Sequence, residues 1–86
     1  MARKTRKTIR ELASAAEAAL GIEITVVGNR AAHYAEETGD GYWLTREDLA
    51  YAIACASEHG SDAYSHWCAG TGSQMSERSR RKIFDR

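Results

Sequence analysis

The clearest pattern of apolar and polar positions lies in residues 45–60, TREDLAYAIACASEHG. At about 100° per residue, the apolar positions form one stripe, which consists of Leu49, Ala52, Ile53 and Ala56 and is bordered by Cys55 and His59. Thr45 offers a capping hydroxyl, and Glu47 and Asp48 place negative charge at the positive end of a helix. Because Gly60 favours helix termination, the pattern predicts a helix here with one face in the core.

A second helical pattern begins at Thr8. Residues 8–11, TIRE, match a capping box, in which the threonine hydroxyl caps the helix and the glutamate reaches back to the capping residue. Apolar residues then recur at helical spacing, at Ile9, Leu12, Ala13, Ala16, Ala19 and Leu20. Gly21 followed by Ile22 is typical of a helix end with its apolar contact, so the helix is predicted to end at Leu20.

The apolar period changes from 3.6 to 2 at residue 22, and β-branched residues dominate up to residue 27, which predicts a first strand over 22–27. Gly28 and Asn29 favour a turn, after which residues 31–37 are predicted to return as a second strand. A further turn precedes a short third strand at residues 42–44. Since short connections join consecutive strands, an antiparallel sheet is expected, with helices covering its apolar face.

The last third of the chain predicts shorter elements. Residues 63–69 form a short helical pattern that Gly70 closes, residues 70–73 resemble a flexible linker, and residues 74–85 form a weaker helical pattern. The expected fold is therefore α+β in one small domain over residues 1–86. It has a helix, a three-stranded antiparallel sheet, a helix, and then one or two short C-terminal helices packed on one face.

Composition limits the core that these elements can build. Leu, Ile, Val and Phe account for only 12 of the 86 residues, so 15 alanines and the Trp and Tyr rings must supply the remaining core volume. A small domain with so thin a core leaves apolar surface for another chain to cover. We therefore expect a homodimer or an obligate complex.

The zero net charge conceals a strong division of charge along the chain. Residues 11–77 contain eleven acids against only Arg30 and Arg46, whereas a basic N-terminal arm, 1–7, and a basic C-terminal tail, 78–86, flank this acidic body. Such ends bind nucleic acid or an acidic protein, fold over their own body, or act as solvated tails. The candidate nucleic-acid-binding residues are Arg3, Lys4, Arg6, Lys7, Arg10, Arg78, Arg80, Arg81 and Lys82.

Cys55, His59, His66 and Cys68 have the right donor atoms for a tetrahedral metal site. Their spacing does not match the usual zinc patterns, and the alternative is that the cysteines are small buried residues and the histidines exposed helix-end residues. We expect no metal and no cofactor. The first ten residues lack an apolar signal region and no window has the length of a membrane span, so a cytoplasmic protein with reduced thiols is expected.

Aromatic residues next to acids suggest a binding surface for another protein. In a short strand, Tyr42 and Trp43 point to opposite faces, so one of them must leave the helix-covered side. An exposed ring rimmed by acids would bind a partner, and the candidate residues are Glu23, Glu36, Glu37, Tyr42 and Trp43. The alternative is a core aromatic residue that the C-terminal helix covers.

The predicted order of helix, three antiparallel strands and helix over residues 8–60 resembles the double-stranded-RNA-binding domain in topology. That family has a basic cluster at the start of its second helix, whereas residues 45–49 here are TREDL, so no functional residue is carried over. An alanine-rich, proline-free and charge-segregated chain is also similar in style to short accessory proteins of phages and mobile elements, including anti-CRISPR inhibitors.

These patterns favour a non-enzymatic interaction protein whose acidic body binds a basic surface of a nucleic-acid-associated protein complex. The resemblance to phage accessory proteins implies an inhibitor. The alternative is a small nucleic-acid-binding protein that uses its basic ends as arms. No arrangement of Ser, His, Asp or Cys has the sequence context of a nucleophilic enzyme.

Overall fold

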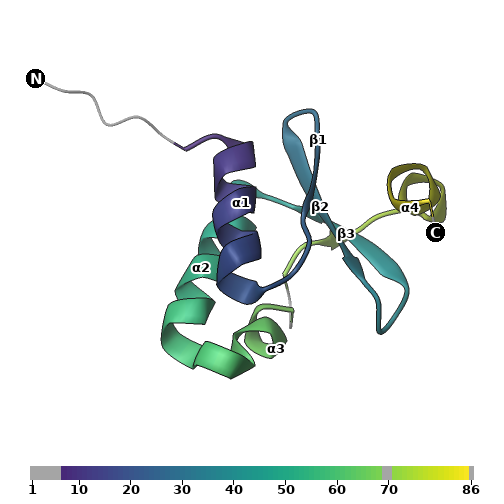
Figure 1. Cartoon of the computed structure of the whole chain (residues 1–86). Coiled ribbons are helices and arrows are strands. Elements are labelled where there is room, and N and C mark those ends of the chain that lie inside the picture. Colours follow the sequence, from purple (N-terminus) through teal and green to yellow (C-terminus); the bar gives the residue numbers. More distant parts are fainter. Residues whose placement is uncertain (1–6, 69–70, 86) are drawn as a thin grey trace, which may run out of the picture.

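The computed structural model describes residues 7–68 and 71–85, which form an α+β fold (Figure 1). In chain order the elements are α1 (Ile9–Leu20), β1 (Thr25–Val27), β2 (Arg30–Ala35), β3 (Asp40–Leu44), α2 (Arg46–His59), the 3-10 helix η1 (Gly60–Asp62), α3 (Ala63–Cys68), β4 (Ser73–Gln74) and α4 (Glu77–Phe84). The predicted fold class is confirmed, but the sheet has four strands instead of three. Within the described ranges, no helix is long and apolar enough to cross a membrane.

Both long helices begin with the predicted caps. The Thr8 hydroxyl accepts a hydrogen bond from the Glu11 amide at 3.1 Å, and the Glu11 carboxylate accepts one from the Thr8 amide at 2.8 Å. These bonds to Thr8 lower the pKa of Glu11 because they stabilise its ionised form. Thr45 and Asp48 form the same reciprocal pair at the start of α2, at 3.1 and 2.9 Å.

The sheet has the strand order β1-β2-β3-β4, and all neighbours are antiparallel. β1 begins at Thr25, three residues later than predicted, because the preceding backbone bonds to side chains instead of to a strand. The Ile24 amide donates to the Glu17 carboxylate at 2.7 Å, and the Glu23 carbonyl accepts from His33 at 2.9 Å. These two bonds attach the segment before β1 to α1 and β2.

The fourth strand contains Ser73, the last residue of the predicted linker, and Gln74, the first residue of the predicted last helix. Ser73 pairs with Trp43, Gln74 pairs with Tyr42, and the Met75 amide donates to the Gly41 carbonyl at 2.9 Å. A two-residue strand has no apolar alternation of its own, so only its pairing with β3 reveals it. The predicted end of α3 at residue 69, and Gly70 after it, lie outside the described residues.

One face of the sheet, called here the helical face, contains Ala31, His33 and Leu44 and is covered by α1, α2 and α3 (Figure 1). The core on this face is centred on Trp67 of α3 and Leu49 of α2, with exposed fractions of 1% and 0%. Small residues of α1, α2 and the sheet complete it. On α2, Cys55 lies in this core instead of on its border, and Ile53 is only half-buried, because α1 and α3 both pack against this helix.

The opposite face of the sheet contains Tyr34, Gly41 and Trp43. The predicted packing of all C-terminal helices on one face is wrong, because α4 lies against this opposite face (Figure 1). The ring of Phe84 is 5.5 Å from the ring of Tyr34, centroid to centroid. Gly41 permits this approach, since a Cβ atom there would meet the Met75 sulfur at 2.8 Å and Phe84 at 3.1 Å. α4 also begins later than predicted because Ser76 caps it.

Candidate functional site

The most buried polar side chain of the described residues is the imidazole of His33, which is 7% exposed and lies on β2 between the sheet and α3. Its Nδ1 atom lies 2.9 Å from the carbonyl oxygen of Glu23, and its Nε2 atom lies 2.9 Å from the hydroxyl of Tyr64. Because a carbonyl can only accept, Nδ1 carries the proton and donates it. Nε2 then accepts a hydrogen bond from the Tyr64 hydroxyl, so each ring nitrogen has a partner.

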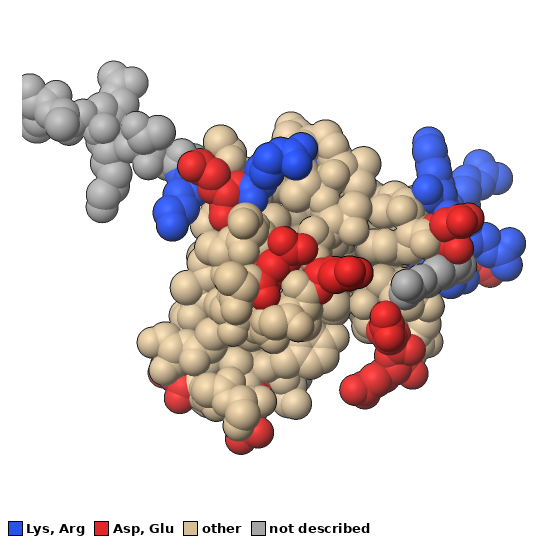
Figure 2. Space-filling view, viewed as in Figure 1, with Lys and Arg blue, Asp and Glu red and all other residues tan. Residues whose placement is uncertain are grey.

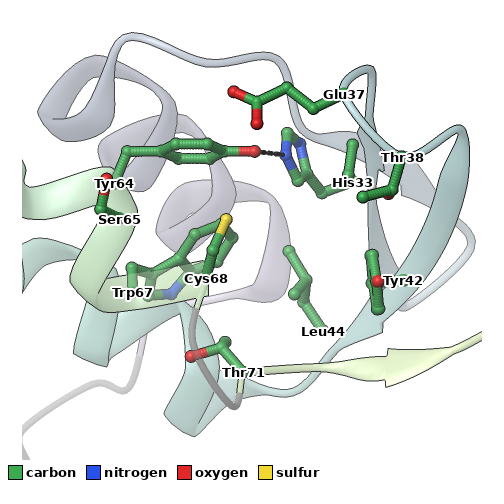
Figure 3. A pocket seen from close by; sticks show the side chains of 11 residues that line it. His33, Glu37, Thr38, Tyr42, Leu44, Tyr64, Ser65, Trp67, Cys68 and Thr71 are labelled. Atoms are coloured by element: carbon green, nitrogen blue, oxygen red, sulfur yellow. Dashed lines mark hydrogen bonds between the residues drawn. The ribbon is translucent and has the colours of Figure 1, made fainter.

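Tyr64 reaches His33 from α3, and Figure 3 shows its hydroxyl pointing directly at the imidazole. The His33 ring meets the rings of Tyr64 and Trp67 edge to face, with centroids 5.7 Å away in each case. Burial raises the pKa of Tyr64 above its ordinary value of 10.0, and the neighbouring Cys68 and Glu37 raise it further. The phenol therefore stays protonated at neutral pH and remains a donor to His33.

An apolar pocket of about 430 Å³ opens on one side of this pair (Figure 3). Its walls come from β2, β3 and α3, and they include Ala35, Tyr42, Leu44 and Trp67. Trp67 is fixed in this wall because its indole N–H donates to the Asp48 carbonyl at 2.8 Å. The pocket is therefore a preformed cavity between the sheet and α3.

An acidic pocket of about 750 Å³ lies on the other side of the pair. Its lining includes three carboxylates and three aromatic rings, which belong to Glu23, Glu36, Glu37, Tyr34, Tyr64 and Phe84. Residues that directly follow α1 and the last residues of α4 also border it. His33, Glu37 and Tyr64 line both pockets, so these three side chains form a ridge between them.

Four of the five predicted partner-binding residues line one of the two pockets, and Trp43 lines neither. Glu23, Glu36 and Glu37 border the acidic pocket, and Tyr42 lines the apolar pocket. Trp43 lies on the opposite face, where the guanidinium of Arg30 sits 3.7 Å from its ring centroid. The structure therefore brings four of the five candidates together and separates the tryptophan from them.

No lysine or arginine of the described residues is among the side chains that line the two pockets, although the last residues of α4 border the acidic one. In Figure 2, Lys and Arg side chains gather over α4 and near the start of α1, and acidic side chains lie in the region between them. Arg78, Arg80, Arg81 and Lys82 belong to α4, while Lys7 and Arg10 lie at the start of α1. Arg3, Lys4 and Arg6 lie outside the described residues.

The alternative metal ligands are not gathered into a site. Cys55 is buried in the core, whereas Cys68 is exposed at the rim of the apolar pocket. His59 and His66 stack face to face, 3.7 Å apart and 12° from parallel, so their nitrogen lone pairs lie in parallel planes and do not converge. Among the residues that the structure describes, no group of three or more metal-binding side chains could hold an ion.

His33 lies at the centre of the site, but no sequence motif marks it as a functional residue. The strand pattern contains a signal, because Ala31, His33 and Ala35 alternate on one side of β2 and place the histidine on the buried face. Its two partners come from residues 23 and 64, which are distant in sequence, so the hydrogen bonds depend on the tertiary structure.

Comparison with known protein families, curated proteins and solved structures finds no match to this chain.

Proposed function

We propose that this protein is a non-enzymatic interaction protein that binds a basic surface of another protein through the surface around the acidic and apolar pockets. The similarity in style to phage accessory proteins suggests an inhibitor of a nucleic-acid-associated complex as the role. The free thiols suit a reducing compartment such as the cytoplasm.

One observation carries this proposal. Glu23, Glu36 and Glu37 come from two different segments of the chain, and they border one pocket whose other walls include aromatic rings. Carboxylates attract a basic partner over a distance, and partly buried aromatic side chains are the residues that most often anchor protein interfaces.

The contacts of His33 support a binding role over a catalytic one. A general base needs a nitrogen that can reach a substrate proton. In His33, Nδ1 already donates to the Glu23 carbonyl and Nε2 already accepts from Tyr64. Together these contacts connect β2 to α3 and to the segment before β1, so the imidazole stabilises the shared wall of the pockets.

The test uses a fluorescent nona-arginine peptide as the basic probe at roughly 0.15 M ionic strength, where screening acts over about 8 Å. We expect saturable binding that weakens several-fold in a Glu23→Gln/Glu37→Gln variant. Glu58→Gln/Glu47→Gln removes the same charge from α2, away from the pockets, and is expected to bind like the unmodified protein. If the two variants bind the peptide equally weakly, binding depends only on the net charge of the protein, which would contradict the proposal.

Nucleic-acid binding is a second candidate, favoured by the exposure of Arg78, Arg81 and Lys82 on α4. Phosphate contacts by these residues would make affinity for duplex DNA or RNA fall steeply with salt. An Arg78→Gln/Arg81→Gln/Lys82→Gln variant preserves Phe84 and its contact with Tyr34. Submicromolar duplex binding that this variant loses would favour the second candidate.

A further inference from the structure

The two pockets share a wall, so a single ligand can reach both of them. His33, Glu37 and Tyr64 line both cavities, so a chain that crosses the ridge places neighbouring side chains in environments of different chemistry. One cavity is bordered by carboxylates and aromatic rings, and the other by Ala35, Leu44 and Trp67.

The acidic pocket has the chemistry of a cation site. Among residues 7–68 and 71–85, its lining contains three glutamates and neither lysine nor arginine. The segment after α1 and the last turn of α4 also border it, and the C-terminal ends of helices favour positive charge. Tyr34, Tyr64 and Phe84 also line the pocket, and aromatic rings interact favourably with cations.

These walls favour arginine over lysine. A guanidinium is planar, so it can stack on an aromatic ring and at the same time donate two parallel hydrogen bonds to a carboxylate, whereas an ammonium is a compact, strongly hydrated charge. The protein already uses this pairing on the opposite face, where the Arg30 guanidinium lies 3.7 Å from the centre of the Trp43 ring.

The apolar pocket suits a large apolar side chain. Its volume of about 430 Å³ is bounded by Ala35, Leu44 and Trp67, and the Trp67 indole is held in place by its hydrogen bond to Asp48. Binding in a preformed apolar cavity removes ligand surface from water without reorganising the protein.

Resting on the proposed function, we propose that the partner segment places one arginine side chain in the acidic pocket and one large apolar side chain in the apolar pocket, with its backbone crossing the ridge of His33, Glu37 and Tyr64. The partner is therefore recognised by a pair of neighbouring residues, one cationic and one apolar, and not by positive charge alone.

The experiment titrates the ¹⁵N-labelled protein with capped Gly/Ser peptides that contain one Arg and one Leu, separated by one, two or three residues. The two tryptophan indole signals serve as internal reporters. Trp67 lines the apolar pocket, whereas Trp43 lies on the opposite face beneath Arg30. We expect at least one spacing to shift the Trp67 indole and the amides of Glu23 and Glu37, while the Trp43 indole stays in place.

Matched changes separate the two anchors. Replacing Arg by citrulline, which keeps the shape and removes the charge, is expected to weaken the best peptide at least ten-fold, and Lys should weaken it less. Replacing Leu by Gly should weaken it by a similar factor and leave Trp67 unshifted. In the protein, Ala35→Phe fills the apolar pocket and should abolish the Leu effect while the Arg effect remains.

Several results would overturn this inference. Equal binding of the Arg and citrulline peptides, or a shift of Trp43 in place of Trp67, would contradict it. If nona-arginine binds but no Arg-Leu peptide reaches the pockets, this inference fails and the proposed function stands. If neither probe binds, both fail. If the protein sediments as a dimer and Glu23→Gln dissociates that dimer, the occupant of the pockets is a second copy of this chain.

Discussion

One tryptophan lies on each face of the sheet, but the two tryptophans differ in how deeply they are buried. On the helical face, Trp67 is 1% exposed, its indole N–H is bonded to Asp48, and it lies in a core to which α1, α2, α3 and the sheet contribute. On the opposite face, Trp43 is only half-buried, and the side chain described over its ring is the charged Arg30. A single short helix, α4, reaches this face through Phe84.

This contrast indicates where the fold gains its stability. Alanines on α1, α2 and the sheet let the helices approach closely, so a core with little Leu, Ile and Val closes around one large indole. The opposite face has a cation over an aromatic ring and a half-buried phenylalanine, and both contacts are individually weak. We therefore expect substitutions on the two faces to differ strongly in their effects.

The largest expected effect comes from Trp67→Ala. Removal of a buried aromatic side chain costs about 3–5 kcal/mol, and this change also leaves the Asp48 carbonyl without its indole donor. Urea unfolding followed by circular dichroism measures the loss. Trp43→Ala is the matched control and should cost about 2 kcal/mol or less, because it removes a half-buried ring and its cation contact. Similar losses for the two variants would contradict the contrast between the faces.

Phe84→Ala is expected to cost about 2 kcal/mol at most, since only half-buried apolar surface is removed. The physical consequence is local, because Phe84 attaches α4 to Tyr34 and Gly41. Hydrogen exchange should become faster in α4 while the amides of α1 and α2 keep their protection. Loss of protection in α1 and α2 as well would mean that both faces unfold as one unit.

Tyr64→Phe is expected to cost about 1 kcal/mol, because the ring stays and the His33 Nε2 atom loses its donor. The same variant reports on pH. Since the pKa of Tyr64 is raised in the folded protein, its protonated form contributes stability that is fully present below about pH 10 and is lost as pH rises towards the folded pKa. Above pH 10, the unmodified protein should lose stability more steeply than Tyr64→Phe, in unfolding titrations at matched pH values. Parallel pH curves would contradict this assignment.

The smallest expected effect is that of Arg30→Gln, which removes the cation over Trp43 and should cost about 0.5–1 kcal/mol. Arg46→Gln serves as a control that removes the same charge from the start of α2. The Trp43 indole signal should move in the Arg30 variant and stay unchanged in the control. A loss above about 2 kcal/mol would show that the opposite face contributes more than a surface contact.

The local elements that the sequence predicted correctly are those with complete local signals. Thr8 and Glu11 form the predicted capping box, and Thr45 caps α2 as predicted, with the Asp48 carboxylate bonding back to the Thr45 amide. The errors occur where a local pattern competes with a distant partner. β1 starts later than predicted because Glu17 and His33 bond to the backbone before it. β4 forms only because it pairs with β3.

The candidate site shows the same division. The pattern placed Tyr42 and Trp43 on opposite faces, as the structure has them, because the alternation of a strand is a local property. The contact between His33 and Tyr64 could not be predicted, because it joins segments that are far apart in sequence.

The sequence by itself therefore determined the helix caps, the helical and strand periods, the turns and the division of charge, since each depends on residues within one or two turns of each other. Only the tertiary structure decided which face each helix covers, that α4 crosses to the opposite face, and that two pockets meet at His33 and Tyr64. The physical reason is that packing and long-range hydrogen bonds depend on which surfaces fit together in three dimensions, and a linear pattern of apolar and polar residues does not contain that information.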